Sequence, residues 1–468
     1  MTEEAVRSQG IWASLREAVG GSSQDFTRGS LNRAVYLLAI PMILEMAMES
    51  VFAVADAFFV SRLGADALAT VGLAESMLTL VYGVALGLAM GTTAMVARRI
   101  GEKRPEAASV VAVQAVALAV VLSLVTGIPA FMYGGRLLAL MGASPSIIAV
   151  GSGYTSILLG TNLVIMLLFV HNAIFRGAGD ASFAMRALWF ANLINLVLDP
   201  CLIFGLGPFP ELGLTGAAIA TTIGRGSGVL FQLWLLRSGR GRVKVERGAW
   251  RVRPDIMLRL LRLAATGAGQ FLVATASWVV LIRIVSTFGS SAVAAYTLAV
   301  RIILFALLPA FGVSNAAATL VGQNLGAGEP RRAENSVWLT GLYTSIFLAG
   351  VMVLFLFFGE YLVRLFTTEP VLVAQASACL RVISYGYIFY AWGMVMIQAF
   401  NGAGDTVTPL WINLGCFWAC EIPLAWFLSQ HTSLGLTGVF WSVAFSEMLL
   451  AVISMAVFRR GTWKTRTV

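Results

Sequence analysis

The sequence predicts an all-α integral membrane protein, in which twelve transmembrane helices form two six-helix lobes related by a pseudo-two-fold axis along the membrane normal. Three observations support this prediction. The chain is unusually apolar, its first half is repeated in its second half, and its basic residues concentrate in alternate connecting segments.

The composition favours a membrane protein. Hydrophobic residues make up 58% of the 468 residues, and Asp, Glu, Lys and Arg together make up only 12%. A soluble domain is about 25% charged, so this chain has too few polar residues to cover a water-soluble surface. Period-2 alternation is absent, which argues against a membrane β-barrel. Twelve apolar stretches of span length are expected at 35–60, 68–97, 107–132, 147–172, 181–205, 214–236, 257–288, 292–321, 334–358, 371–400, 407–428 and 436–458.

The segment before the first span contains no apolar stretch typical of a cleavable signal peptide. Ile11, Trp12, Leu15 and Val19 either form one face of a short surface helix or belong to a disordered tail.

The basic residues predict the orientation, because Lys and Arg concentrate in cytoplasmic loops. If the N-terminus is cytoplasmic, the inner segments hold 25 of the 32 Lys and Arg residues and the outer loops hold three. Both termini are therefore expected in the cytoplasm. The same distribution accounts for the net charge of +9 through the anionic inner leaflet, without nucleic acid.

An internal repeat divides the chain. The stretch FRGAGD at 175–180 returns as FNGAGD at 400–405, so the numbering shifts by 225 between the two copies. Gly101 matches Gly326 at the same displacement, and after a three-residue slip LGLTG at 212–216 matches 434–438. Six spans per copy place both copies the same way up. The expected divisions are an N-terminal segment 1–34, an N-terminal lobe 35–236, a basic linker 237–256, a C-terminal lobe 257–458 and a tail 459–468.

Two similar lobes leave a seam between them, and a seam that opens to either side is the geometry of alternating access. The repeat therefore favours a transporter. The repeated GAGD turns are expected to be structural, with Gly permitting the turn and Asp capping the next helix. His171, near an inner helix end, is likewise expected to be structural.

Acidic residues within spans are functional candidates, because burial in the bilayer costs roughly 2.5–3.5 kcal/mol each on insertion scales. Glu45, Glu49 and Asp56 share one face of the first span, and Asp199 lies on the fifth. Glu75, on the second span, lies close enough to the outer end to snorkel. The matching positions of the second copy hold Gln270, Ala274, Leu281 and Leu424. The acid site is therefore expected in the N-terminal lobe alone, which suggests that this lobe binds the coupling cation.

Several motifs resemble one transporter family, the multidrug and toxic compound extrusion (MATE) family. They are VADAFFVSRLGADALA at 54–69, the two GAGD turns, and NLVLDPCLIFG at 195–205 followed by GLTGAAIATTI at 213–223. The last pair is the most specific, and it resembles the branch with a fifth-span Asn and Asp. The resemblance covers residues from about 33 to 460.

The resemblance implies a cation site formed by Asp56, Asn195, Asp199 and Thr221, with a bend of the first span at Pro41. It implies export of organic, often cationic, compounds in exchange for H⁺ or Na⁺. It also implies a multi-pass protein of the bacterial or archaeal plasma membrane, expected as a monomer with no cofactor, no metal beyond Na⁺ and no enzyme activity.

Arg225 departs from the family pattern. An intramembrane Arg needs a partner, and Asp199, Glu45 and Glu49 are the candidates. Pairing with Asp199 would keep that carboxylate ionised. The matching position in the second copy is Glu447.

Other functions remain as alternatives. The ARRIGEKR loop resembles major-facilitator transporters, which also have six plus six spans, although the GAGD turns do not belong to that pattern. A lipid-linked sugar flippase would favour cations along its seam. A membrane enzyme would need clustered catalytic groups, and the sequence contains no HExxH motif and no Cys/His cluster.

Overall fold

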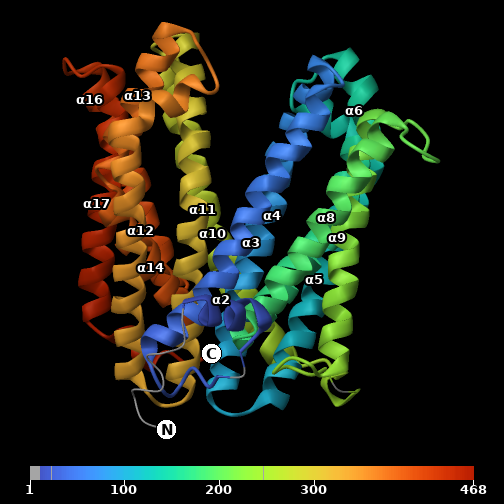
Figure 1. Cartoon of the computed structure of the whole chain (residues 1–468), viewed down its shortest axis with the longest axis vertical. Helices are drawn as coiled ribbons and strands as arrows, with labels where there is room; N and C mark the ends of the chain where they lie inside the picture. The colour runs from blue at the N-terminus through green and yellow to red at the C-terminus, as the bar shows by residue number, and fades with distance from the viewer. Residues whose placement is uncertain (1–10, 23, 246) are drawn as a thin grey trace.

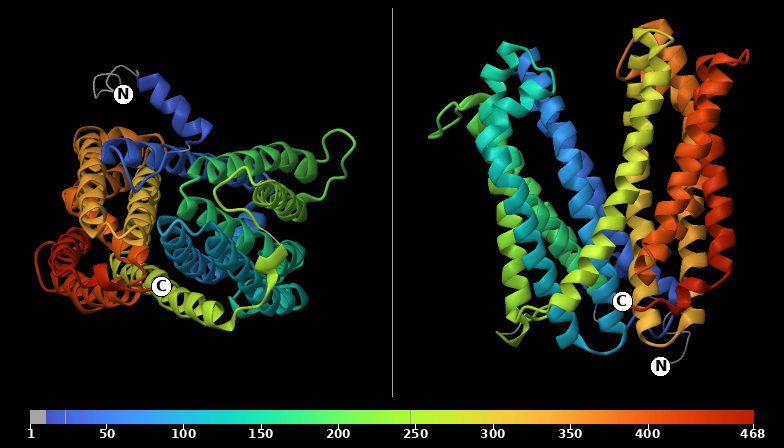
Figure 2. Two further views of the ribbon diagram at one scale, coloured as in Figure 1. Left: turned by 90° about the horizontal axis from the view of Figure 1, so that it is seen from below. Right: turned by 180° about the vertical axis from the view of Figure 1, so that it is seen from behind.

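The structure is a computed structural model that describes residues 11–22, 24–245 and 247–468, and these residues form two helical lobes arranged as a V (Figure 1). The lobes approach each other at one end and separate toward the other. Helix α2 (Ile11–Gly20), the linker between the lobes and the last residues of the chain lie at the joined end, which we call the closed end. Figure 2 shows the same V from behind.

The N-terminal lobe (N lobe) consists of seven helices that make six crossings. They are α3 (Leu31–Ser61), α4 (Ala65–Gly101), α5 (Pro105–Leu140), α6 (Pro145–Gly160), α7 (Asn162–Ala178), α8 (Ala181–Phe204) and α9 (Gly213–Ser238). A short helix, η1 (Arg247–Trp250), lies in the linker.

The C-terminal lobe (C lobe) repeats this order. Its elements are α10 (Pro254–Ser286), α11 (Ser290–Gly326), α12 (Pro330–Arg364), α13 (Pro370–Ser384), α14 (Tyr387–Ala403), α15 (Val407–Asn413), the π-helix η2 (Leu414–Glu421), α16 (Ile422–Gln430) and α17 (Leu436–Arg459). The 3₁₀ helix η3 (Thr462–Thr465) follows.

The predicted all-helical, two-lobe fold is confirmed. Ten helices of the described chain are long and apolar enough to cross a membrane, or eleven if the bent pair α13 and α14 forms one span. The remaining expected span is α9. Its 26 residues reach roughly 39 Å at 1.5 Å per residue, but Arg225 and Gln232 lower its hydropathy.

The fourth crossing of each lobe is interrupted at matching positions, which the sequence patterns do not predict. In the N lobe α6 ends at Gly160 and α7 begins at Asn162. In the C lobe α13 and α14 meet at an angle of 59° around Gly386, which matches Thr161 at the displacement of the repeat. The interruption is therefore part of the repeat.

Repeated glycines let the lobes cross closely toward the closed end. A Cβ on Gly101 of α4 would lie 2.0 Å from the carbonyl oxygen of Gln323 on α11. Its repeat partner Gly326 would place a Cβ 2.2 Å from the carbonyl oxygen of Arg98 on α4. These two contacts are reciprocal, because Arg98 and Gln323 also occupy matching positions of the two copies. The contacts thus follow the expected pseudo-two-fold symmetry.

The N-terminal segment joins the two lobes at the closed end. Residues 11–20 form a helix, so the surface-helix alternative holds over these residues. After α2, backbone carbonyls of Ser22 and Gln24 accept hydrogen bonds from Arg242 of the linker. The carbonyls of Phe26 and Gly29 accept from Arg332 of α12 in the other lobe.

Candidate functional site

Three of the four predicted cation-site residues form one hydrogen-bonded set. Asp199 of α8 and Asn195, one helical turn before it, are both buried. With its amide nitrogen toward Asp199, Asn195 donates to Oδ2 at 2.7 Å. Its amide oxygen then accepts from the Thr221 backbone N–H at 2.9 Å and from the Thr221 hydroxyl at 3.2 Å. This orientation satisfies both ends of the Asn195 amide, so α8 and α9 are tied together at this point.

Asp56 lies near this set without bonding to it. Its carboxylate on α3 is within electrostatic range of Asp199 and of Glu75 on α4. It makes no hydrogen bond to any residue that the structure describes, and Asp199 makes no ion pair with any of them. Two carboxylates from different helices therefore face each other without a paired cation.

Arg225 pairs with Glu49, one of the three candidates left open by the sequence. The Arg225 Nη2 atom lies 3.1 Å from Glu49 Oε1, and the guanidinium stands over the ring of Phe52 at 5.4 Å. Asn192 also donates to Glu49, at 3.3 Å. Asp199 is consequently not neutralised by Arg225.

Glu45 is used differently from Glu49. It is fully buried, pairs with Arg176 of the FRGAGD turn, and accepts from Asn172 at 3.0 Å. In the C lobe the matching residues are Gln270 and Asn401, whose amides exchange hydrogen bonds of 3.0 and 3.3 Å. The ion pair of one lobe is thus an amide pair in the other. This exchange accounts for the one residue that differs between FRGAGD and FNGAGD.

Each lobe contains a hollow built from matching positions. The N-lobe chamber, about 180 Å³, is lined by Leu158, Thr161, Val164, Ile165, Thr221, Thr222 and Arg225. The C-lobe chamber, about 330 Å³, is lined at the matching positions by Ile383, Gly386, Tyr390, Val443, Ala444 and Glu447, and further by Trp278, Ile303, Leu307 and Tyr387. The chambers are therefore repeat-related, but a base in one is replaced by an acid in the other.

The expectation that acids are confined to the N lobe is wrong. Glu421, the last residue of the π-helix η2, is buried, and its Oε2 atom has no hydrogen-bond partner in the described chain. Its carboxyl lies within electrostatic range of Glu447. Glu421 follows Asp199 at a displacement of 222 in the numbering, which also joins Arg225 to Glu447. The two C-lobe acids make no ion pair with any described residue, because Ala274 stands where the N lobe has Glu49.

The expected role of the GAGD aspartates is half right. Asp405 accepts from the Thr408 backbone N–H at 3.3 Å and so caps the following helix. Asp180 does not cap α8. Its Oδ2 atom accepts from the backbone N–H of Arg242 at 2.6 Å, and Oδ1 lies 3.5 Å from the Arg242 guanidinium.

Pro41 lies within α3, which continues unbroken from Leu31 to Ser61. The bend at Pro41 stays a prediction. It would require a second conformation of this helix, since Pro already lacks the N–H that would hold the turn.

Comparison with known proteins decides the family. The MatE family model matches residues 41–201 and 268–427, which is more than half of the chain and includes parts of both lobes. The chain belongs to the MatE family. It is therefore a relative of multidrug efflux transporters, and the family places it among transporters rather than enzymes. The major-facilitator alternative is wrong.

Individual MATE proteins match over nearly the whole chain. A probable multidrug resistance protein of Bacillus subtilis, YoeA, is 25% identical over 453 residues, which span 95% of this chain and 97% of the relative. The solved outward-facing structure of a multidrug resistance MATE transporter matches with a TM-score of 0.88 at 27% identity, covering 94% of this chain and 98% of that one. A MATE structure in the bent conformation matches with a TM-score of 0.87 at 26% identity, covering 95% and 97%.

Proposed function

We propose that this MATE protein is a secondary active antiporter that exports organic, cationic compounds in exchange for H⁺ or Na⁺ by alternating access. The observation that carries the proposal is the buried set of Asn195, Asp199 and Thr221 with Asp56 facing it. A buried carboxylate without a paired cation is costly, so it must bind a proton or another cation when it is enclosed.

The hydrogen bonds favour a proton as the coupling ion. Sodium prefers several oxygen ligands, and the side chains of Asp56, Asn195, Asp199 and Thr221 could in principle supply them. However, Asn195 turns its N–H rather than its oxygen toward Asp199. One Asp199 oxygen is thereby occupied as an acceptor, and the other remains available for a proton. Sodium binding would require the Asn195 amide to rotate.

The Arg225–Glu49 pair supports the same role for Asp199. If Arg225 neutralised Asp199, the carboxylate would stay ionised and could not cycle. Glu49 supplies the counter-charge instead, which leaves Asp56 and Asp199 as an acidic pair. Like charges that share a site favour uptake of one proton, so the pair titrates as a unit.

Coupling then follows from a change in the N lobe. Protonation removes the repulsion between α3, which carries Asp56, and α8, which carries Asp199. The first span can repack and reduce the space for substrate, and release of the proton on the other side resets the lobe. Substrate and cation must weaken each other's binding by the same factor.

The C-lobe chamber supports a cationic substrate. Glu447 and Glu421 have no cationic partner among the described residues, and the rings of Trp278, Tyr387 and Tyr390 surround the Glu447 side of the hollow. Aromatic faces together with a carboxylate attract ammonium groups. An organic cation is thus the substrate class that this lobe fits best.

The charge distribution supports an orientation with the closed end in the cytoplasm of a bacterial or archaeal cell and both termini on that side. The V then opens outward. Each lobe has its own core and the coupling set lies within one lobe, so a monomer is sufficient for transport.

Export of a fluorescent cationic dye from proteoliposomes tests the proposal. We expect an imposed proton gradient to drive export by the wild type and not by Asp199→Asn. A sodium gradient with no proton gradient separates the two ions. Equal export in the absence of either gradient would contradict an antiport mechanism.

A further inference from the structure

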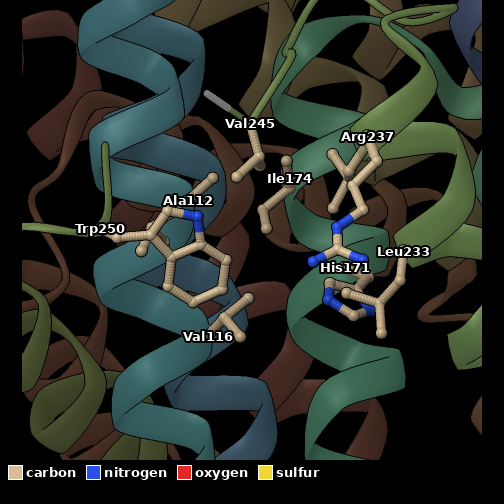
Figure 3. A pocket seen from close by; sticks show the side chains of 10 residues that line it. Ala112, Val116, His171, Ile174, Leu233, Arg237, Val245 and Trp250 are labelled. Atoms are coloured by element: carbon tan, nitrogen blue, oxygen red, sulfur yellow. The ribbon is translucent and has the colours of Figure 1, made fainter. Parts of the chain in front are cut away.

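A hollow of about 670 Å³ lies in the N lobe near the closed end, away from the coupling set. It is formed by α5, α7, the end of α9 and the linker. Its apolar wall includes Ala112 and Val116 of α5, Leu233 of α9, and Val245 and Trp250 of the linker. Figure 3 shows the Trp250 ring lying beside α5, with His171 and Arg237 on the opposite side of the space.

Two polar groups without partners face this space. His171 is fully buried, and neither of its ring nitrogens has a hydrogen-bond partner of acceptable geometry, although Gln232 lies beside the ring. Buried polar atoms normally have partners, so an unpartnered imidazole in a hollow points to a missing ligand. Arg237, at the end of α9, makes no hydrogen bond or ion pair with any part of the chain that the structure describes. One side of the hollow therefore offers a positive charge and an imidazole.

The position of the hollow restricts the occupant. It lies at the end of the spans where basic residues concentrate, and Trp250 at its rim is 59% exposed, as is typical of Trp at a membrane interface. Basic pockets between spans on this side of a membrane bind anionic lipid head groups. The walls are apolar enough to hold hydrocarbon, whereas a free inorganic anion would leave them empty.

We propose that this hollow binds an anionic phospholipid from the leaflet at the closed end. Arg237 donates hydrogen bonds to the phosphate, and the neutral His171 ring donates its N–H to a phosphate or ester oxygen. One acyl chain lies against Val116, Val245 and Trp250. Because the lipid contacts both the helices and the linker, it fixes the linker against the N lobe.

Native mass spectrometry of the full chain with phosphatidylglycerol or phosphatidylcholine tests this proposal. The wild type should retain phosphatidylglycerol in preference to phosphatidylcholine, and Arg237→Gln should reduce that preference about fivefold, since one basic residue near the surface contributes about this much. The matched control is Arg240→Gln. Arg240 lies three residues further along, and its guanidinium stands over the Trp234 ring at 4.5 Å rather than in the hollow. Loss of the preference in both variants would mean a general surface attraction and would overturn the site.

A second measurement locates the acyl chain. Phosphatidylglycerol with brominated chains should quench the fluorescence of Trp250, measured as the difference between the wild type and Trp250→Phe. Quenching should weaken in Arg237→Gln and persist in Arg240→Gln. If Trp250 is not quenched, the hollow does not hold the lipid. Neither readout depends on transport, so the result is independent of the proposed antiport.

Discussion

Arg225 of α9 binds Glu49 of α3 rather than Asp199 of the neighbouring α8, with Nη2 3.1 Å from Oε1. This pairing separates two kinds of acid within one lobe. Glu49 and Glu45 each have an arginine partner, whereas Asp56 and Asp199 have none among the residues described. The unpaired acids are those expected to take up the coupling cation.

Removal of Arg225 should show which acid it compensates. Arg225→Leu leaves Glu49 without its partner, and we expect a loss of unfolding free energy of at most about 3 kcal/mol. The loss should be at the low end for such pairs because the Glu49 side chain is 34% exposed. Combination with Glu49→Gln should recover much of the loss in thermal unfolding. Recovery by Asp199→Asn instead would show that the pairing is different.

The glycine crossing at the closed end should tolerate no added methyl group. Gly101→Ala places a Cβ against the Gln323 carbonyl, so we expect overpacking to lower the unfolding free energy by about 1–3 kcal/mol. Gly226→Ala is the matched control, because nothing lies within 4 Å of its Cβ position in α9. That change should be neutral or stabilising by up to about 1 kcal/mol. Similar effects of both substitutions would show that the lobes do not cross at Gly101.

The linker contact should depend on pH. Burial raises the pKa of Asp180 to about 6, and the backbone N–H and guanidinium of Arg242 offset this only in part. Because the folded state then binds the proton more tightly than the unfolded state, Asp180 contributes stability that is complete below about pH 4 and is lost as the pH rises through about 6. Thermal unfolding between pH 4 and 7 should therefore differ between the wild type and Asp180→Asn.

Asp25 is the control for this prediction. Its burial alone would raise its pKa, but hydrogen bonds from Lys103 and Thr27 hold the pKa at about 2. Asp25 stays ionised across the tested range, so Asp25→Asn should change stability by the same amount at every pH. A flat difference for Asp180→Asn as well would rule out its titration.

The C-lobe acids should affect substrate binding more than coupling. Glu447→Gln removes a carboxylate from the aromatic chamber, and we expect about tenfold weaker binding of a cationic dye. The pH dependence of transport should be retained. Binding of a neutral dye of similar size serves as the control, and an equal loss for both dyes would indicate a packing defect.

The sequence predicted the fold well because hydropathy and the repeat are properties of long segments. It missed the break at Thr161 and the π-helix before Glu421, since both are local changes within apolar stretches. Hydropathy also overstated how clearly α9 is a span, as Arg225 shows.

The site was predicted less completely, for a geometric reason. Spacing places Glu45 and Glu49 on one face of α3, but the rotation of α7 and α9 against that face decides which arginine each acid meets. The match between Glu421 and Asp199 was missed because the two copies were aligned at a displacement of 225 through a region where it has already become 222. The smaller displacement, which relates Arg225 to Glu447, was visible in the sequence and would have exposed the match.

The affinity of the purified protein for a cationic dye, measured against pH, tests the central claim most directly. If Asp56 and Asp199 form the coupling site, dye affinity should fall as the pH is lowered in the wild type, because proton and substrate weaken each other's binding. Asp199→Asn and Asp56→Asn should both flatten this dependence while Glu421→Gln keeps it. A pH dependence that survives unchanged in both aspartate variants would contradict the account and would point to Glu45 or Glu49 instead.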